Sequence, residues 1–237
     1  MGLKRPIVLT VMAAGLALAL PATPVTALLP PASAEIGVPR DGTIEFAVFR
    51  KGEQIGTHKL TFEPRGEQLQ VHVDANLKVQ MLFVTVYRYQ HQSTELWSGD
   101  RMVEFQSATR QNGKEWQVDA HVADGDGLVV HANDEHRVLP ASLLPTSYWR
   151  PEMMETSRWF NTQFGSTIDV KVEPRGTEQI QAAGDMLNAH RYKVTGVVAE
   201  TGKPVDLDLW YASNGELVKM EFIAVADGSR VEFRRIS

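Results

Sequence analysis

Apolar and polar residues alternate without interruption from position 69 to position 81, in the stretch LQVHVDANLKVQM. Successive side chains of a β-strand point to opposite faces of a sheet, so this period of two predicts a strand with one dry and one wet face. Helical spacing would place apolar residues three or four positions apart. The apolar members are Leu69, Val71, Val73, Ala75, Leu77, Val79 and Met81.

Turn sequences divide the rest of the chain into further strands. Gly, Asn–Gly and Asp–Gly supply the positive φ values that tight hairpins need, and short connections make neighbouring strands pair. We therefore predict a mainly β fold, a long curved antiparallel meander of about 10–12 strands, about seven before residue 133 and about five after 166, forming a half-barrel or open barrel. The signals are RKGE (50–53), PRGE (64–67), WSGD (97–100), QNGK (111–114), DGDG (124–127), SNGE (213–216) and ADGS (226–229).

One short echo lies within this pattern. The sequence EPRGEQLQ at 63–70 returns as EPRGTEQIQ at 173–181. Proline and glycine are common in turns, so we interpret the echo as a second use of the same turn chemistry, with an internal duplication as the alternative.

The alternation stops between residues 140 and 164. Pro151 followed by Glu152 suits a first helical turn, because proline needs no N–H partner there and an acid is favoured at the positive end of the helix dipole. Gly165 is a typical helix end. We expect a helical insert here, preceded by a shorter helix over ASLL (141–144), packed on the concave face of the sheet. The large side chain of Trp149, between the two helices, is expected to anchor the insert first and to contact a ligand second.

The beginning of the chain resembles an export signal. Lys4 and Arg5 precede an uncharged apolar run at 7–20, which is shorter than the about 20 residues of a membrane-spanning helix. Small residues follow, and they offer cleavage after Ala34 or, alternatively, after Ala27. We predict a signal peptide at 1–34, a flexible mature start at 35–42 and one β-rich domain at 43–237.

Composition restricts the modifications and the binding partners that we expect. The chain has no cysteine, which excludes disulfides and a lipid-modified N-terminal cysteine. Without Lys4 and Arg5 the mature chain has 22 basic and 29 acidic residues, a net charge of −7. This charge argues against nucleic acid and anionic lipid headgroups as partners. We expect a soluble periplasmic protein with no transmembrane segment in its mature part.

Histidines are the first candidates for a metal site. If DGDG forms the hairpin turn, His121 faces Val130 and His131 faces Ala120, so His121 and His131 project from opposite faces. That separates them, although His136 follows nearby. We predict no metal site and interpret these residues as solvated strand histidines.

Other candidate chemistry is sparse. DGDG lacks the remaining acids of a calcium loop, and Asp206 and Asp208 are typical of a solvated strand face. The chain has no nucleophile elbow, phosphate loop or dinucleotide fingerprint. We predict no catalytic residues and no cofactor.

The stretch MLFVTVYRYQH, residues 81–91, departs from strict alternation and is apolar on both faces around Leu82 to Val86. It is either the most buried strand segment or the lining of a cavity. Methionine and aromatic side chains suit adaptable apolar pockets. The candidate ligand-binding residues are Met81, Phe83, Tyr87, Tyr148, Trp149, Met153, Met154, Trp159 and Phe160.

Several segments together resemble a known family, which is a domain-of-unknown-function family of uncharacterised exported proteins of Gram-negative bacteria. The resemblance covers most of residues 43–237 and implies no activity. The layout is more distantly similar to lipoprotein-carrier folds, in which a concave sheet and helices hold acyl chains. The segments are FAVFRKGEQIGTHKLTF (46–62), PTSYWRP (145–151), RYKVTG (191–196), LWYASNGELVKMEF (209–222) and DGSRVEF (227–233).

These observations favour a non-catalytic protein that binds a hydrophobic or lipid-like ligand between the sheet and the insert. One alternative is a cell-envelope interaction module with a filled core, and a second is an enzyme of unrecognised type. An empty apolar cavity of several hundred Å³ would favour the ligand.

Overall fold

The alternating stretch forms strand β3, Gln68–Met81, in the computed structural model. Its apolar side chains from Leu69 to Val79 are buried and the polar ones between them are partly or fully exposed, which confirms the predicted dry and wet faces. The structure describes residues 36–123, 127–224 and 227–237, without the side chain of Met81. The predicted signal peptide at 1–34 lies outside the described residues.

Fourteen strands form one antiparallel sheet in the described part of the chain. They are β1 (Thr43–Arg50), β2 (Glu53–Arg65), β3 (Gln68–Met81), β4 (Val84–Ser98), β5 (Arg101–Gln111), β6 (Lys114–Val122), β7 (Gly127–Ala132), β8 (Glu135–Pro140), β9 (Arg158–Asn161), β10 (Ser166–Ala182), β11 (Asp185–Val198), β12 (Pro204–Ala212), β13 (Leu217–Ile223) and β14 (Arg230–Arg235). Seven strands precede residue 133 and five begin at or after 166, as predicted; the structure adds β8 and β9 between them.

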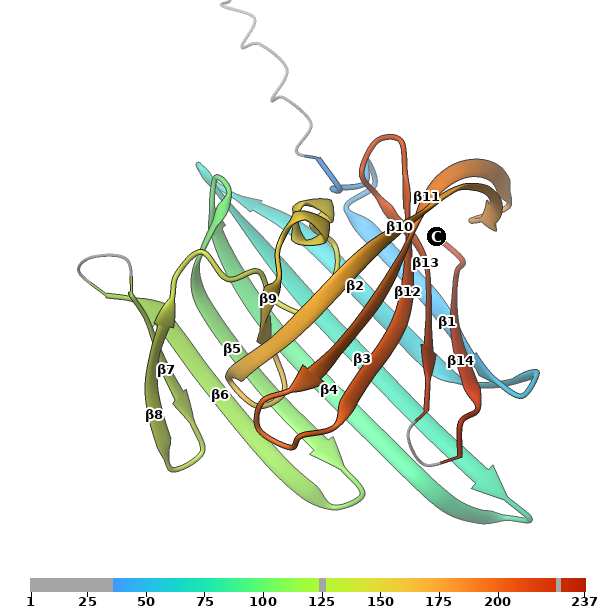
Figure 1. The fold of residues 1–237 in the computed structure, drawn as a ribbon, viewed down its shortest axis with the longest axis horizontal. Coiled ribbons are helices and arrows are strands. Elements are labelled where there is room, and N and C mark those ends of the chain that lie inside the picture. The colour runs from blue at the N-terminus through green and yellow to red at the C-terminus, as the bar shows by residue number, and fades with distance from the viewer. Residues whose placement is uncertain (1–35, 124–126, 225–226) are drawn as a thin grey trace, which may run out of the picture. The chain divides into compact units, whose positions relative to one another are not determined.

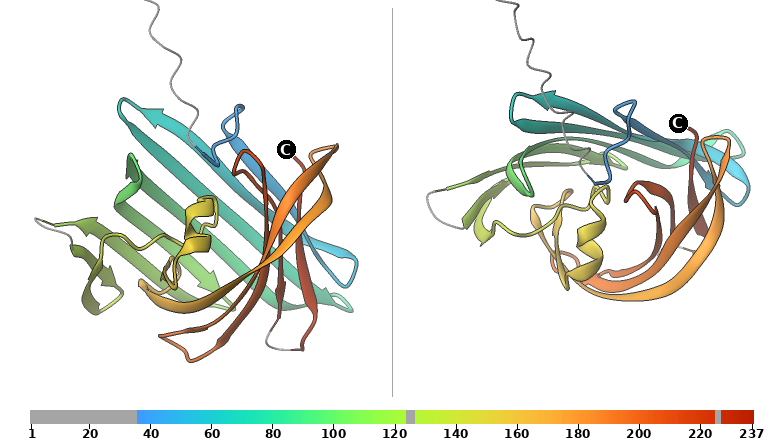
Figure 2. Two further views of the ribbon diagram at one scale, coloured as in Figure 1. Left: turned by 45° about the horizontal axis from the view of Figure 1, so that its top comes forward. Right: turned by 90° about the horizontal axis from the view of Figure 1, so that it is seen from above.

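The strand order is β8-β7-β6-β5-β4-β3-β2-β1-β14-β13-β12-β11-β10-β9 (Figure 1). Consecutive strands are neighbours in this order except for β8 and β9, and the additional pairing of β1 with β14 joins the two ends of the meander. The sheet curves strongly, and the segment between β8 and β9 lies inside the curve (Figure 2). The edges of the sheet, β8 and β9, therefore come from the middle of the chain.

The predicted helical insert is wrong. Between residues 140 and 164, which are all described, the structure has one five-residue 3-10 helix, Pro151–Glu155, and the strand β9. Thr156 ends the helical turn: its backbone is extended, and its N–H and hydroxyl both donate to the carbonyl of Met153. A Thr hydroxyl that bonds to nearby backbone competes with helix continuation. Residues 141–144 are not helical either.

Gly165 has a different role from the expected helix stop. It lies in the turn between β9 and β10 with a φ of 60°. A methyl group at this position would lie 2.8 Å from Cγ1 of Val130 and 2.9 Å from Cγ1 of Val118. The turn after β9 therefore packs directly on the inner face of β6 and β7, where only glycine fits.

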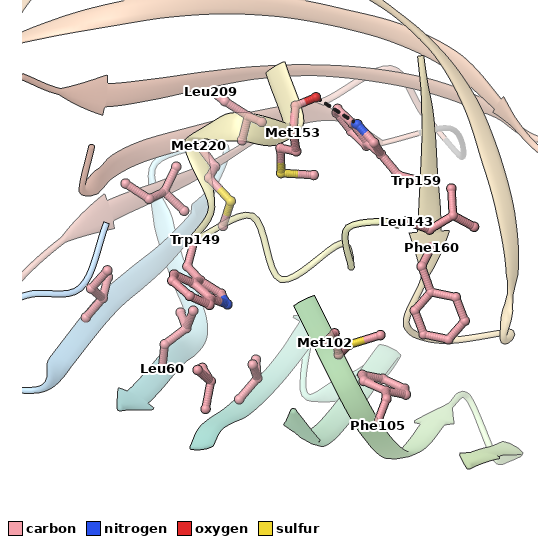
Figure 3. Close-up of a cluster of buried hydrophobic side chains, with 14 of the residues drawn as sticks. Leu60, Met102, Phe105, Leu143, Trp149, Met153, Trp159, Phe160, Leu209 and Met220 are labelled. Atoms are coloured by element: carbon pink, nitrogen blue, oxygen red, sulfur yellow. Dashed lines mark hydrogen bonds between the residues drawn. The ribbon is translucent and has the colours of Figure 1, made fainter. Parts of the chain in front are cut away.

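A hydrophobic core joins the concave face of the sheet to the segment between β8 and β10 (Figure 3). The ring of Trp149 packs edge-on against Phe62 of β2 and Trp97 of β4, with centroids 5.4 and 5.2 Å apart. Phe160 of β9 meets Phe105 of β5 at 5.1 Å. The segment between β8 and β10 is thus fixed by its aromatic side chains, and the expected packing role of Trp149 is confirmed by its complete burial.

Two smaller features concern the predicted flexible start and the repeated EPRG sequence. Within residues 36–42, Gly37 and Pro39 are buried, and Val38 packs against the core. The first EPRG sequence forms the β2–β3 turn, but the second lies inside β10, where the register shifts between Pro174 and Thr177. The same chemistry makes a turn in one place and a β-bulge in the other. Among the described residues, no helix is long and apolar enough to cross a membrane.

Candidate functional site

The inner face of β4 carries polar groups at every second position. Pairing of Ala75 with His91 places this set on the same face as the buried residues of β3. The neighbouring strand β5 adds Ser107 and Thr109, which are also buried. One wall of the concave interior is therefore polar although it faces away from solvent. The β4 residues are Tyr87, Tyr89, His91, Ser93 and Glu95.

A cavity of about 370 Å³ lies against this wall. The opposite wall comes from β12, β13 and β14 and is mainly apolar. Phe222 faces the cavity and keeps 36% of its surface exposed. The lining includes His58, Val73, Ala75, Leu77, Tyr87, Tyr89, His91, Ser93, Thr146, Tyr148, Phe164, Ile168, Leu207, Met220, Phe222 and Phe233.

Two buried histidines stand side by side in this lining. His58 of β2 and His91 of β4 both flank Ala75 of β3 in the sheet. Burial, together with a smaller effect of the nearby His91, lowers the pKa of His58 to about 3. Burial also lowers the pKa of His91 to about 4. Both imidazoles are neutral at physiological pH because a charged ring would lose its hydration there.

Not all the polar atoms of this wall are satisfied. Nδ1 of His91 lies 2.7 Å from the hydroxyl of Thr109. By contrast, Nε2 of His58 and Oγ of Ser93 are buried and have no hydrogen-bond partner. A buried polar atom without a partner is costly to a fold, and such atoms are rare. These two atoms border a mainly apolar cavity, where a bound molecule can pair with them.

The remaining ionisable groups of the described lining are either neutral or paired with an opposite charge. Burial raises the pKa of Tyr148 to about 12 and also raises that of Tyr89. The carboxylate of Asp206 pairs with Lys193 at 2.5 Å. Glu221 pairs with Lys219 and Arg230 at 2.7 and 2.6 Å. The described lining thus presents neutral donors and acceptors rather than free charges.

A buried carboxyl closes the inner end of the site. Nε1 of Trp97 and Nε1 of Trp149 donate to the same carboxyl oxygen of Glu95, at 2.9 and 3.0 Å. The Arg150 guanidinium lies over both indole rings, 4.9 and 5.1 Å from their centroids. Burial raises the pKa of Glu95, although the two indoles and Arg150 oppose the shift. This cluster joins the TSYW segment to β4.

A second cavity, of about 480 Å³, lies at the opposite end of the site. Leu77, Tyr87 and Phe222 line both cavities, so the two are adjacent. Arg50 and Lys203 are the cationic residues of the outer one. The interior therefore runs from a closed end at Glu95 to an open end beside the β3–β4 hairpin.

The structure separates the candidate ligand-binding residues into groups. Tyr87 and Tyr148 line the cavity. Phe83 is fully exposed at the tip of the β3–β4 hairpin, and the side chain of Met81 lies outside the described set. The others are buried in the core that fills the closed end; they are Trp149, Met153, Met154, Trp159 and Phe160.

The stretch 81–91 is not the most buried strand segment. Leu82, Val84 and Val86 are exposed, and the cavity lining begins only at Val86 and Tyr87. The sequence analysis missed His58, His91 and Ser93. Their signal was available: a polar side chain at every second residue of β4, in phase with the dry face of β3 once the two strands pair.

The histidine prediction was wrong in its geometry. The β6–β7 register pairs His121 with Val129 and His131 with Asp119, one residue from the expected pairing. The two rings therefore share a face, with centroids 6.5 Å apart, and His136 lies 4.4 Å from His131. No group of three potential ligands with metal-binding geometry occurs among the described residues. His121 and His131 are stacked, and His136 meets His131 edge-on.

Asp206 and Asp208 share one face of β12, as predicted, but Asp208 is buried there rather than solvated. Both accept from Nζ of Lys193, at 2.5 and 3.0 Å, and Asp208 also accepts from Arg191 at 2.8 Å. They belong to an ion-pair network with an evident structural role.

Comparison with known proteins places the fold and the family. No curated protein matches the sequence significantly. A crystal structure of a "beta-barrel-like protein" of the DUF1849 family from Brucella abortus matches with a TM-score of 0.58 and 12% identity, over 82% of this chain and 95% of that one. This likeness shows the fold alone. A "putative lipoprotein" from Parabacteroides distasonis reaches a TM-score of 0.36 at 12% identity, over 87% of this chain and 99% of that one, too low to carry an argument. The family model of DUF6134, a domain of unknown function, matches residues 46–236, and the chain belongs to that family.

Proposed function

We propose that this protein is an exported, periplasmic binding protein without catalytic activity, which holds an uncharged amphipathic lipid in the cavity between β4–β5 and β12–β14. The carrying observation is the pair of unpartnered buried atoms, Nε2 of His58 and Oγ of Ser93, beside a mainly apolar cavity. A ligand hydroxyl, ester or keto group satisfies them. The apolar part of the ligand packs against Met220, Phe222 and Phe233.

The charge state of the cavity supports a neutral ligand over an anion. His58 and His91 stay uncharged at neutral pH, so neither neutralises a carboxylate or phosphate. Burying an unpaired anion costs far more than burying a hydroxyl. The size also fits: about 370 Å³ lies within the usual range for small-molecule sites, and the outer cavity offers further length.

The first experiment compares two fluorescent probes that differ only in the polar end. Delipidated protein is titrated at pH 7 with a pyrene-labelled fatty alcohol and with the corresponding fatty acid. We expect the alcohol to bind more tightly. His58→Phe should weaken alcohol binding by up to about tenfold, the usual worth of one hydrogen bond. The matched control, His190→Phe, changes an exposed histidine and should bind as the wild type does.

A second variant tests whether the probe occupies the interior. Ala75 lines the cavity between His58 and His91, so Ala75→Phe fills the space and should abolish binding of both probes. Native mass spectrometry of protein purified from its own envelope should show a bound lipid in the wild type and none in Ala75→Phe. Equal probe binding by both proteins, or no binding by the wild type, would refute the proposal.

A further inference from the structure

The tip of the β3–β4 hairpin is apolar and points into solvent. Leu82 and Phe83 form the two-residue turn, with 90% and 100% of their surface exposed. Val84 and Val86 follow, 63% and 48% exposed. The hairpin projects at the lower right of Figure 1. Other large exposed apolar residues of the described chain do not form such a run; the tip concentrates four within five positions.

The conformation of this turn makes the choice of residues unusual. Leu82 and Phe83 have φ values of 48° and 74°, in the left-handed region that β-hairpin turns of this type require. Three other two-residue turns of this sheet have the same positive φ pair, and each places glycine second: Lys51–Gly52, Asn112–Gly113 and Ala183–Gly184. A bulky side chain is strained there.

Packing among the described residues does not compensate that strain, because Phe83 is fully exposed and Leu82 is 90% exposed. An Asn–Gly pair closes the same kind of turn at β5–β6 without an apolar surface. Folding therefore does not account for Leu82 and Phe83, and their apolar side chains serve contact with something outside the chain.

The charged residues near the tip indicate what kind of surface the tip contacts. No Asp or Glu occurs from residue 75 to residue 94, so the net negative charge lies elsewhere on the chain. Lys78 and Arg88 are exposed and directly opposite each other across β3 and β4. Like charges in that position repel. At about 3.3 Å per residue, Lys78 lies roughly 13 Å behind the turn, where its side chain reaches phosphates when the tip is inserted.

We propose that the β3–β4 tip inserts into the surface of an anionic phospholipid bilayer. Leu82 and Phe83 enter the boundary between headgroups and acyl chains, a depth of about 5–10 Å, and Lys78 and Arg88 meet the lipid phosphates. Val86 and Tyr87, just behind the tip, line the outer cavity, so this contact holds the open end of the interior at the membrane. The proposal does not depend on which ligand the interior binds.

The test is co-sedimentation with vesicles of phosphatidylcholine, with and without phosphatidylglycerol. Wild-type protein should bind the anionic vesicles. The double variant Leu82→Asn/Phe83→Gly recreates the β5–β6 turn sequence at the tip and should fold at least as stably. It should lose vesicle binding by tenfold or more, because each deleted side chain removes a large apolar contact. Val138→Ser, which changes an exposed apolar residue of β8, is the matched control and should bind normally.

Two further measurements show which residues of the hairpin contact the membrane. Lys78→Gln/Arg88→Gln should remove the preference for phosphatidylglycerol, and Phe83→Trp should show blue-shifted emission on vesicles. Absence of wild-type binding, or full binding by Leu82→Asn/Phe83→Gly, overturns the proposal. The proposal is also overturned if the wild type binds no vesicles but sediments as a dimer, and the double variant sediments as a monomer. The tip would then join two copies of the chain. Probe binding in the cavity is measured without vesicles, so failure of the ligand proposal leaves these results unchanged.

Discussion

Glu95 shows how one residue ties a long loop to a sheet. One of its two carboxyl oxygens accepts hydrogen bonds from two indoles. Trp97 is on the same strand, and Trp149 comes more than fifty residues later. Both partners are completely buried, so water cannot replace these bonds. The packing of Trp149 and the hydrogen bond to Glu95 therefore act together to hold the segment between β8 and β9.

Trp149→Ala should destabilise the protein strongly. The change removes a completely buried ring and leaves a cavity, which typically costs about 3–5 kcal/mol, and it also leaves Glu95 with one donor fewer. That is a large part of the ~5–15 kcal/mol that keeps a domain folded. A thermal melt should show a clear drop. Phe83→Ala, at a fully exposed aromatic, serves as control; equal melts for the two variants would contradict the anchoring role.

His58 should make stability fall as the solution becomes acidic. Its pKa is about 3 in the folded protein and about 6.5 when unfolded, so the unfolded chain binds the proton more readily. Its contribution is fully present above pH 6.5 and is lost as the pH falls toward 3. His58→Phe should have a smaller drop in melting temperature between pH 6.5 and 4, and His190→Phe should keep the wild-type slope. A slope unchanged in His58→Phe would show that the imidazole is not buried.

At the scale of elements, the sequence predicted what depends on period two. The alternation at 69–81 sets both faces of β3, and glycine turns place most hairpins. The β3–β4 turn was not predicted because Leu82–Phe83 lacks any turn signal. The helix failed because Pro151–Glu152 is a start signal for a single turn, whereas Thr156 and the pairing of Trp159 with Ile168 draw the chain into β9.

The candidate site was less predictable than the fold. Tyr87 and Tyr148 were identified by their aromatic character, and both line the cavity. Trp159 and Phe160 have the same character but fill the core. The difference depends on how far the segment after β8 reaches across the concave face, and pairwise strand patterns do not encode that distance. The polar wall of β4 was missed because polar residues at alternate positions ordinarily indicate the wet face.

Substitution of Gly165 tests the contact between the β9–β10 turn and the inner face of β6 and β7. Gly165→Ala adds a methyl group 2.8 Å from Val130 Cγ1 and imposes a left-handed alanine. Gly113→Ala imposes the same backbone strain, but its methyl group meets nothing within 4 Å. Both should lower the melting temperature, and Gly165→Ala should lower it clearly more. Equal losses would mean that the turn does not pack on β6 and β7.

At the scale of the whole molecule, the sequence predicted a meander but gave no sign that its ends meet. Twelve of the thirteen strand pairings join consecutive strands, and only β1 with β14 brings distant segments together. Alternation specifies a strand and a face, but it does not name a partner across the length of the chain. The curvature that brings β14 to β1 is a property of the assembled sheet.

The export prediction is checked by the mass of the mature protein. Cleavage after Ala34 should give a chain beginning at Glu35, and use of the earlier site should give one beginning at Leu28. Intact-mass spectrometry of the periplasmic fraction distinguishes the two products. A chain that retains residues 1–20 in that fraction would contradict the signal-peptide interpretation.

The pairing of β1 with β14 also has a consequence for biosynthesis. The ribosome makes β1 before β14, so β1 can pair with β2 early but its other edge stays open until β14 has been made. An open edge is a template for strands of other chains. The backbone of Glu45 bonds to both Ile236 and Ser237, so these two residues after β14 also take part in closing it. A chain that stops short of β14 would therefore expose that edge permanently, and nascent chains in which β1 has been made but β14 has not are open to intermolecular pairing.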